Sequence, residues 1–241
     1  MIQDKKIDIK KNNRFRAIIV LQGRVRSARL PGKGFFNFYE QTVWARMCQI
    51  ALSCSFADKV VFATGDTDEN FLAESIARDA GVEFLVGSES NVYERFYEVS
   101  RKYPSEFIVR VTCDNYLVQP DLLEDVFNLV ESKNADYGFI EPLSHYGGEV
   151  IRSTLFHDFR KPSEQAKEHV TWDFRCNDNV AKVSLPSNFK GINHAESITL
   201  DNIEDFILMK KLESTSDDFR PVRCIGALQK MDFNKILSHR G

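Results

Sequence analysis

The sequence predicts a single α/β domain of the three-layer, Rossmann-like class, built on a mostly parallel central sheet. Three observations point to it: short apolar runs alternate with longer amphipathic segments, polar loops follow the apolar runs, and 43% of the 241 residues are apolar. Such runs are typical of strands buried on both faces, and strands that alternate with helices form parallel sheets. A chain of this length and composition can bury one sizeable core.

The first half of the chain alternates regularly. A strand is expected at Phe15–Leu21, and a polar, glycine-bearing loop over 22–34 follows it. The later elements of this half are, in order, a helix over 38–53, a strand over 59–64, a charged helix ending before Gly81, a strand over 82–86, a helix over 91–103, a strand over 107–112 and a helix over 121–132. Because right-handed crossovers place the loops after parallel strands at one edge, the ligand is expected there.

The alternation weakens from Asp136 onward. A loop is expected over 142–148, a helix over 163–175, a strand over 197–200 and a helix over 202–212. We expect residues 15–241 to form one continuous domain, with an insertion around 140–196. Residues 1–14 are polar and lysine-rich and are expected to be a flexible tail.

Composition and charge exclude several classes. A net charge of −3 argues against a protein whose main partner is nucleic acid, since that needs a concentrated basic surface. Five cysteines, an odd number without C-x-x-C spacing, indicate reduced thiols rather than disulfides or a zinc site. No apolar run approaches the roughly 18 residues that span a membrane, and the N-terminus lacks the apolar segment of a secretory signal. The expected location is therefore the cytoplasm.

The loop after the first strand is rich in cations. Its residues 22–33 are Gln-Gly-Arg-Val-Arg-Ser-Ala-Arg-Leu-Pro-Gly-Lys. Glycine lets a backbone approach an anion closely, arginine binds phosphate oxygens through a two-pronged fork, and lysine supplies a compact charge. It is no Walker A motif, because Gly34 rather than Ser or Thr follows Lys33. The loop suits a triphosphate, although a run of cations is also typical of a solvated turn.

Five segments together resemble the cytidylyltransferase superfamily. They are 22–33, similar to Q-A-R-x-x-S-x-R-L-P-G-K; 87–96, similar to G-S-E-x-x-V-x-x-R-[FY]; 109–114, similar to V-R-[IV]-T-G-D; 168–171, similar to E-H-V-T; and 198–206, similar to L-T-[VL]-D-x-x-E-D-[FL]. The resemblance extends from about Phe15 to Leu212. It is to the spore-coat polysaccharide type, which is related to the acylneuraminate and Kdo cytidylyltransferases.

The resemblance implies a nucleotidyltransferase domain with the fold of nucleotide-diphospho-sugar transferases, and it implies roles for particular residues. Nucleotide binding is implied for Gln22, Gly23, Arg24, Ser27, Arg29, Lys33, Glu89 and Arg95, and a catalytic role at the phosphates for Arg24 and Lys33. A Mg²⁺ cofactor is implied at Asp114 and Asp201, and acceptor binding at His145, Gly148, Glu149 and His169. Two carboxylates that share a metal with substrate phosphates suit Mg²⁺.

The residues alone leave other interpretations open. Asp201 is also placed to cap the helix that follows it, and Asp114 to start a turn. Glu89 and Arg95 are equally compatible with the charged surface of a helix, and a lone histidine such as His169 is more often structural.

The implied function is transfer of CMP from CTP to a sugar or related small acceptor, with release of pyrophosphate, in the synthesis of surface polysaccharide or glycoconjugate precursors. An acceptor hydroxyl would attack the α-phosphorus directly, since this transfer depends on positioning and charge and needs no protein nucleophile. The preference for cytosine rests on the resemblance, because spacing and charge do not distinguish CTP from UTP. A homodimer is implied too, with the 140–196 insertion binding the acceptor or the second copy.

The chain departs from the family pattern at four positions. Cys113 replaces a glycine, Asn115-Tyr116 replaces a small residue followed by Pro, and Gly23 replaces an alanine. A side chain at residue 113 would crowd a closely bound nucleotide, so a degenerate nucleotide-binding protein without turnover is one alternative. Another is a glycosyltransferase of the same sheet architecture, although the D-x-D of such enzymes is absent from residues 113–116.

Overall fold

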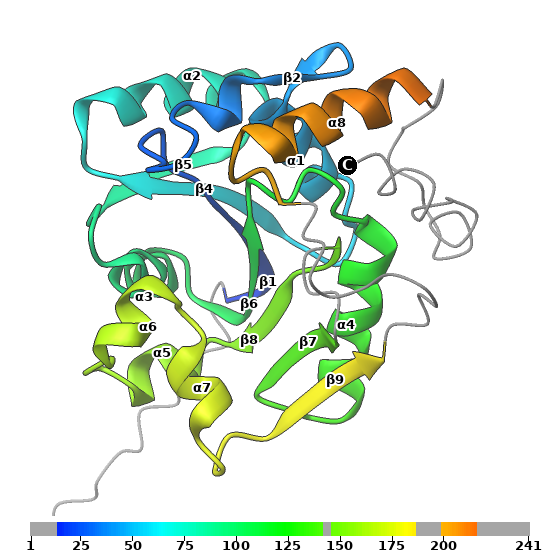
Figure 1. Cartoon of the computed structure of the whole chain (residues 1–241). Helices are drawn as coiled ribbons and strands as arrows, with labels where there is room; N and C mark the ends of the chain where they lie inside the picture. The colour runs from blue at the N-terminus through cyan, green and yellow to red at the C-terminus, as the bar shows by residue number, and fades with distance from the viewer. Residues whose placement is uncertain (1–13, 142–145, 187–198, 216–241) are drawn as a thin grey trace, which may run out of the picture.

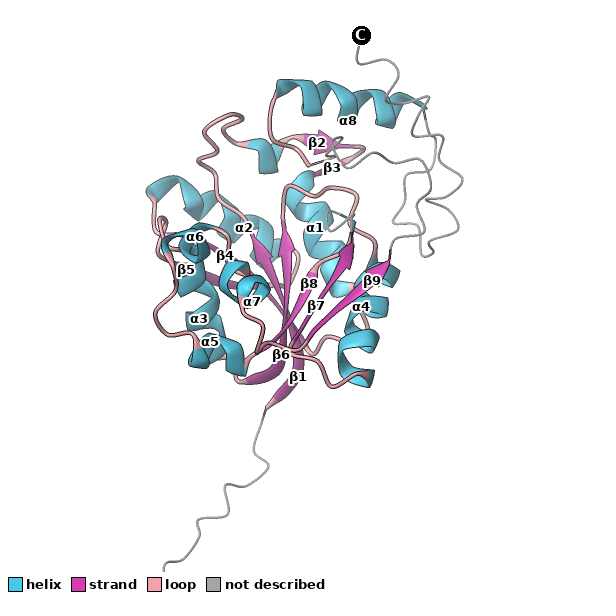
Figure 2. Ribbon diagram, turned by 60° about the horizontal axis from the view of Figure 1, so that its bottom comes forward, coloured by secondary structure: helices cyan, strands magenta, loops and turns pink. Residues whose placement is uncertain are grey.

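The computed structural model describes residues 14–141, 146–186 and 199–215. Within them, a seven-stranded sheet lies between two layers of helices (Figures 1 and 2). The strands of the sheet are β1 (Phe15–Gln22), β4 (Lys59–Gly65), β5 (Glu83–Gly87), β6 (Ser105–Thr112), β7 (Tyr137–Glu141), β8 (Glu149–Arg152) and β9 (Lys182–Pro186), in the order β5-β4-β1-β6-β8-β7-β9. The expected three-layer α/β class is confirmed.

Strand β1 shows why the apolar runs become central strands. It pairs in parallel with β4 on one side and with β6 on the other. Ala17, Ile19 and Leu21 pack into the core on one face of the sheet, and Ile18 and Val20 pack into the core on the other. Because both faces are covered, every position must be apolar. The four strands expected over 15–112 all form, with ends within two residues of those predicted.

The helices fall into two groups by the face that they cover (Figure 2). One face carries α1 (Val43–Leu52), α2 (Phe71–Asp79) and α4 (Pro120–Ser132), and the other carries α3 (Val92–Lys102), α5 (Thr154–Asp158), α6 (Glu164–Glu168) and α7 (Trp172–Cys176). The last described helix, α8 (Ile203–Thr215), contacts the short strand β2 (Asn37–Phe38). Within the described ranges, no helix is both long and apolar enough to cross a membrane.

The first helix begins at Val43 and not near residue 38. Strand β2 and strand β3 (Gln41–Thr42) pair as a short antiparallel hairpin just before it. Thr42 then caps the helix, because its side-chain oxygen accepts a hydrogen bond from the Ala45 N–H at 3.2 Å. The apolar pattern over 38–53 spans hairpin and helix together, so it predicts the helix start about one turn too early.

Three strands lie in the half of the chain where the sequence pattern is weak. Strand β8 runs antiparallel to both of its neighbours, β6 and β7, whereas β7 and β9 are parallel. The segment expected as an insertion, 140–196, therefore supplies strands to the same sheet. The antiparallel direction of β8 places its first residue, Glu149, at the edge where β6 ends, opposite Arg110.

Two other predicted elements differ from the structure. The helix expected over 163–175 is two short helices, because the backbone leaves the helical region at His169 (φ −104°, ψ 76°). The strand expected over 197–200 is not formed at Thr199 and Leu200, and 197–198 lie outside the described residues. The predicted tail, 1–14, also lies outside them except for Arg14.

Candidate active site

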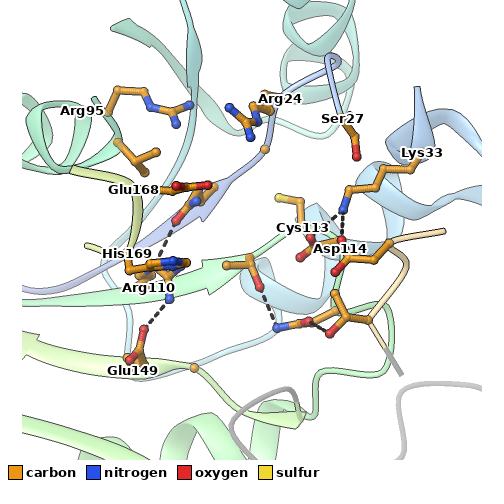
Figure 3. A pocket seen from close by; sticks show the side chains of 18 of the residues that line it. Arg24, Ser27, Lys33, Arg95, Arg110, Cys113, Asp114, Glu149, Glu168 and His169 are labelled. Carbon is orange, nitrogen blue, oxygen red and sulfur yellow. Dashed lines mark hydrogen bonds and ion pairs between the residues drawn. The ribbon is translucent and has the colours of Figure 1, made fainter. Parts of the chain in front are cut away.

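A cavity of about 570 Å³ lies at the carboxyl edge of the parallel strands (Figure 3), within the range of about 300–1,000 Å³ typical of small-molecule sites. Its wall includes six cations, Arg24, Arg29, Lys33, Arg95, Arg110 and Arg175, and four carboxylates, Asp114, Glu149, Glu168 and Asp201. With His169 neutral, the formal charge of this wall is +2, whereas that of the whole chain is −3. The cavity therefore favours an anionic ligand.

The basic loop passes directly over two aromatic rings. A Cβ at Gly34 would lie 2.0 Å from Trp44, and one at Gly23 would lie 2.9 Å from Phe62 and 3.2 Å from Trp44. Both positions thus need glycine for packing, so the replacement of the family's alanine by Gly23 is explained by the rings beneath it. Asn70 is buried and accepts a hydrogen bond from the Val25 N–H at 2.8 Å, which fixes the middle of the loop.

Most of the predicted loop residues line the cavity. Gln22, Gly23, Arg24, Ser27, Arg29 and Lys33 are all in its wall. Arg26 is different, because its guanidinium pairs with Glu69 at 2.6 Å on the exposed surface. The loop therefore directs three of its four cations to the cavity, as an anion-binding loop requires.

Lys33 joins the two predicted metal ligands. Its Nζ donates to Asp114 Oδ2 at 2.7 Å and to Asp201 Oδ1 at 2.8 Å, and Arg29 donates to Asp201 Oδ2 at 2.9 Å. Two carboxylates from distant segments thus meet at one cationic point. Among the described residues, no group of three or more His, Cys, Asp or Glu side chains forms a metal site. Two carboxylates at one point match the protein contribution to a typical Mg²⁺ site, in which phosphate oxygens and water supply the other ligands.

Asp201 is not the cap of helix α8. Asn202 accepts a hydrogen bond from the Asp205 N–H at 2.9 Å, and Asp205 accepts from the Asn202 N–H at 3.1 Å and the Asp201 N–H at 3.0 Å. This reciprocal pair satisfies the start of the helix. The carboxylate of Asp201 is left to face the cavity.

Arg95 is a buried cation in the cavity wall. Its side chain is 1% exposed, and neither Nε nor Nη1 has a hydrogen-bond partner within the described part of the chain. Burial lowers the pKa of Arg95 to about 10, although the negative charge of Glu89 acts to raise it. Figure 3 places Arg95 and Arg24 on one side of the cavity and Lys33 and Asp114 on the other. Glu89, also predicted to bind the nucleotide, is not part of the cavity wall; it accepts a hydrogen bond from Asn70 at 3.1 Å and lies 4.0 Å from Arg24.

Glu149 is the centre of a buried network. It is 3% exposed and accepts from Arg175 at 2.5 Å, from Thr171 at 2.9 Å, and from Arg110 and Tyr137. Burial alone would raise its pKa, but the two guanidiniums and the hydroxyl donors outweigh it and lower the pKa to about 2. With both oxygens engaged, Glu149 orients the cations in the wall.

The other predicted acceptor residues are spread around this network. Gly148 lines the cavity, where a Cβ would lie 2.6 Å from the Arg110 carbonyl oxygen, so the position needs glycine. His169 and Glu168 are exposed at the break between α6 and α7 and also line the cavity. His145 lies outside the described residues.

Of the residues that depart from the family pattern, Gly23, Cys113 and Asn115 line the cavity and Tyr116 does not. Cys113 is 1% exposed and Tyr116 is fully buried, and both pack in the core that also holds Phe38. Burial, with the nearby Cys48 and Asp114, raises the pKa of the Cys113 thiol well above its ordinary value. The thiol is therefore no nucleophile.

Several residues of the wall were not predicted. Arg110 and Arg175 are the main ones, together with Thr112, Asn115 and Thr199. Arg110 had one visible signal, a lone cation in the apolar run of β6 beside a strand end. Arg175 had none, because the helix that carries it has no strong pattern and meets the site only through tertiary packing.

The cation-lined loop after the first parallel strand, facing two carboxylates at the same sheet edge, defines a nucleotidyltransferase of the Rossmann-like class. Residues 17–214 match the family model "Cytidylyltransferase", and the chain belongs to the cytidylyltransferase family. It is accordingly a CTP-dependent enzyme that transfers CMP with release of pyrophosphate.

Individual relatives and solved structures are similar to this chain. The chain is 29% identical over 207 residues to the spore coat polysaccharide biosynthesis protein SpsF of Bacillus subtilis (strain 168), covering 81% of this chain and 85% of that protein. Its fold is similar to that of a cytidylyltransferase from Leptospira borgpetersenii (TM-score 0.76, 19% identity, 93% of each chain). It is also similar to that of a CMP:2-keto-3-deoxy-manno-octonic acid synthetase solved with CTP (TM-score 0.61, 14% identity, 83% and 97%). A third similar fold is Rv0371c of Mycobacterium tuberculosis H37Rv, solved with manganese (TM-score 0.59, 14% identity, 84% and 100%).

Proposed function

We propose that this cytidylyltransferase joins CMP to a sugar-like acceptor that carries an anionic group, as a step in surface polysaccharide precursor synthesis. The observation that carries the proposal is the pair Arg110 and Arg175, both in the cavity wall and both held by Glu149. Glu149 is shared by the two guanidiniums, and Glu168, the other carboxylate on this side of the wall (Figure 3), is exposed to solvent, which screens its charge. A fork of donors held rigidly is suited to a carboxylate or phosphate on the acceptor.

The nucleotide would occupy the opposite part of the cavity. Arg24, Arg29 and Lys33 supply positive charge for the triphosphate and for the departing pyrophosphate. Arg95 offers only hydrogen-bond donors from a buried position. Cytosine presents adjacent acceptors, O2 and N3, to such a donor pair, whereas uracil has an N–H at N3. This difference supports CTP over UTP.

Asp114 and Asp201 would hold a divalent cation, and we propose Mg²⁺. When bound, the metal would neutralise phosphate charge and favour attack by the acceptor hydroxyl. The manganese in the structure of Rv0371c supports the use of a divalent metal in similar folds. The cytoplasmic location and the homodimer expected from the sequence stay predictions.

Pyrophosphate release tests the proposal directly. With CTP and Mg²⁺, we expect release with a carboxylate-bearing sugar acid and at least about tenfold less with a neutral sugar of the same size, since a charge-assisted pair contributes about 1.5–3 kcal/mol. Arg175→Gln should lower kcat/KM for the acid by about tenfold or more. Arg160→Gln is the matched control, because Arg160 is an exposed arginine outside the cavity wall. Equal rates with neutral and acidic acceptors would contradict an anionic acceptor.

A further inference from the structure

The segments that carry Asp114 and Asp201 are tied together next to the carboxylates. The Thr199 hydroxyl donates to Asn115 Oδ1 at 2.8 Å across 84 residues of sequence, and Asn115 Nδ2 donates to the Thr112 hydroxyl at 2.6 Å. We call these three side chains the Asn115 bridge. Beside it, the Leu200 N–H donates to the Asp114 carbonyl oxygen at 2.9 Å.

The bridge is shielded from solvent. Asn115 and Thr199 are each 7% exposed, while Thr112 belongs to the end of β6, which pairs with the end of β1. A buried hydrogen bond is costly to break, because the partner left behind is neither solvated nor paired. The bridge therefore links the end of a central strand to the segment before α8.

The bridge lies immediately beside both carboxylates. Asn115 follows Asp114 directly, and Thr199 precedes Asp201 by two residues. The two carboxylates contact the same ammonium group of Lys33, at 2.7 and 2.8 Å, so their separation is already suited to one small cation. Since metal affinity depends on ligands held in place by their supporting hydrogen bonds, a change in the bridge should change that separation.

We propose that Asn115 is a positioning residue that sets the separation of Asp114 and Asp201, and so the affinity of the nucleotide site for its divalent cation. This inference rests on the proposed metal function of the two aspartates. It also gives Asn115, which departs from the family pattern, a structural role of its own. Asn115 lines the cavity, but its side chain is engaged by Thr112 and Thr199, so its effect is exerted through the two carboxylates.

The test measures Mn²⁺ binding through the electron paramagnetic resonance signal of free Mn²⁺. It is done in the presence of CTP and without acceptor. We expect Thr199→Val, which keeps the side-chain shape and removes the hydroxyl, to weaken Mn²⁺ binding at least about fivefold. Asn115→Ala should weaken Mn²⁺ binding by a similar factor. Thr199→Ser, which keeps the hydroxyl, should retain the wild-type affinity. The double variant Asn115→Ala/Thr199→Val should bind Mn²⁺ no more weakly than the single variant with the lower affinity, because both changes break the same bridge.

Ser153→Ala is the matched control. The Ser153 hydroxyl makes a buried hydrogen bond of 3.1 Å with Ser105 at the opposite end of β6, so its loss removes a comparable bond far from the carboxylates. Its Mn²⁺ affinity should stay that of the wild type. The inference is overturned if Thr199→Val and Asn115→Ala both bind Mn²⁺ within twofold of wild type. If the wild type with CTP binds no Mn²⁺, the proposed metal function itself fails. Melting temperatures of all variants identify any that do not fold.

Discussion

The ammonium group of Lys33 lies where the carboxylates of Asp114 and Asp201 meet, which is also where a divalent cation would bind. The side chain is only 12% exposed, so its charge is poorly screened by water. When no nucleotide is bound, the lysine would compete with the proposed metal for the same two carboxylates. The phosphates of a bound nucleotide would offer Lys33 another anionic partner.

Replacing Lys33 should change metal affinity and turnover in opposite directions. We expect Lys33→Met to bind Mn²⁺ in the absence of nucleotide at least about tenfold more tightly, because a unit charge at about 4 Å contributes up to ~4 kcal/mol at an effective dielectric constant near 20. The same variant should lose about 100-fold or more in kcat, since one donor to the developing charge is gone.

Nucleotide-free Mn²⁺ titration and pyrophosphate release measure the two effects. Arg26→Met is the control, because Arg26 belongs to the same loop but pairs with Glu69 at the surface. Unchanged nucleotide-free Mn²⁺ affinity in Lys33→Met would show that the lysine does not compete with the metal.

The sequence located the cationic loop and the two aspartates because each lies in a short segment with a recognisable pattern. It could not show that Arg95 would be buried with two donors that have no partner among the described residues, since the burial of a helix residue depends on what packs over it. It also missed the Asn115 bridge, because a hydrogen bond across 84 residues has no local signature. Contacts that join distant segments are set by the fold.

Glu149 connects four elements, three of which lie in the second half of the chain. It begins β8 and pairs with Arg110 of β6, Tyr137 of β7, and Arg175 of α7, while Thr171 lies just before α7. Its pKa of about 2 is below the ordinary value of 4.5. A carboxyl with a depressed pKa stabilises the fold fully above about pH 4.5, and that stabilisation is lost as the pH falls towards 2.

We expect Glu149→Gln to remove this pH dependence. The carboxylate contributes about 3 kcal/mol to the free energy of unfolding above pH 4.5, as an order of magnitude. The wild type should lose that amount between pH 4.5 and 2, and the variant should lose less over the same window. At pH 7 the variant should be less stable, because the guanidiniums of Arg110 (18% exposed) and Arg175 (46% exposed) lose their shared counter-charge.

Chemical denaturation at pH 7, 4.5 and 3 measures these differences. Glu106→Gln is the control, since Glu106 lies in the same strand as Arg110 but is half exposed, and its ion pair with Arg152 contributes little. If Glu149→Gln lost stability with falling pH as steeply as the wild type, the network would not be its source.

Helix α7 and strand β8 also show where element prediction fails. Strand β8 has four residues and strand β9 five, and neither is the long apolar run that marked β1 and β6. The break at His169 divides a segment that the sequence predicted as one helix. Short elements are stabilised mainly by the packing of their neighbours, so their own residues specify them weakly.

At the scale of the whole molecule, the sheet brings distant segments to one edge. The cavity wall combines the loop after β1, the end of β6, the first turn of α3, the start of β8 and the segment before α8. Its cations are concentrated in a chain that is otherwise net negative. A ligand in this cavity therefore contacts both halves of the domain.

Because the ligand joins both halves, its binding should stabilise the fold as a unit. A ligand that binds only the native state at about 100 times its Kd adds about 2.7 kcal/mol, which corresponds to a rise in Tm of roughly 5–10 °C for a domain of this size. We expect this rise with CTP and Mg²⁺, and a smaller one with UTP, ATP or GTP. In Arg95→Met, the difference between CTP and UTP should shrink, because the donors that favour cytosine are gone. An equal rise with CTP and UTP in the wild type would remove Arg95 as the source of base selectivity, and no rise with CTP would contradict nucleotide binding in this cavity.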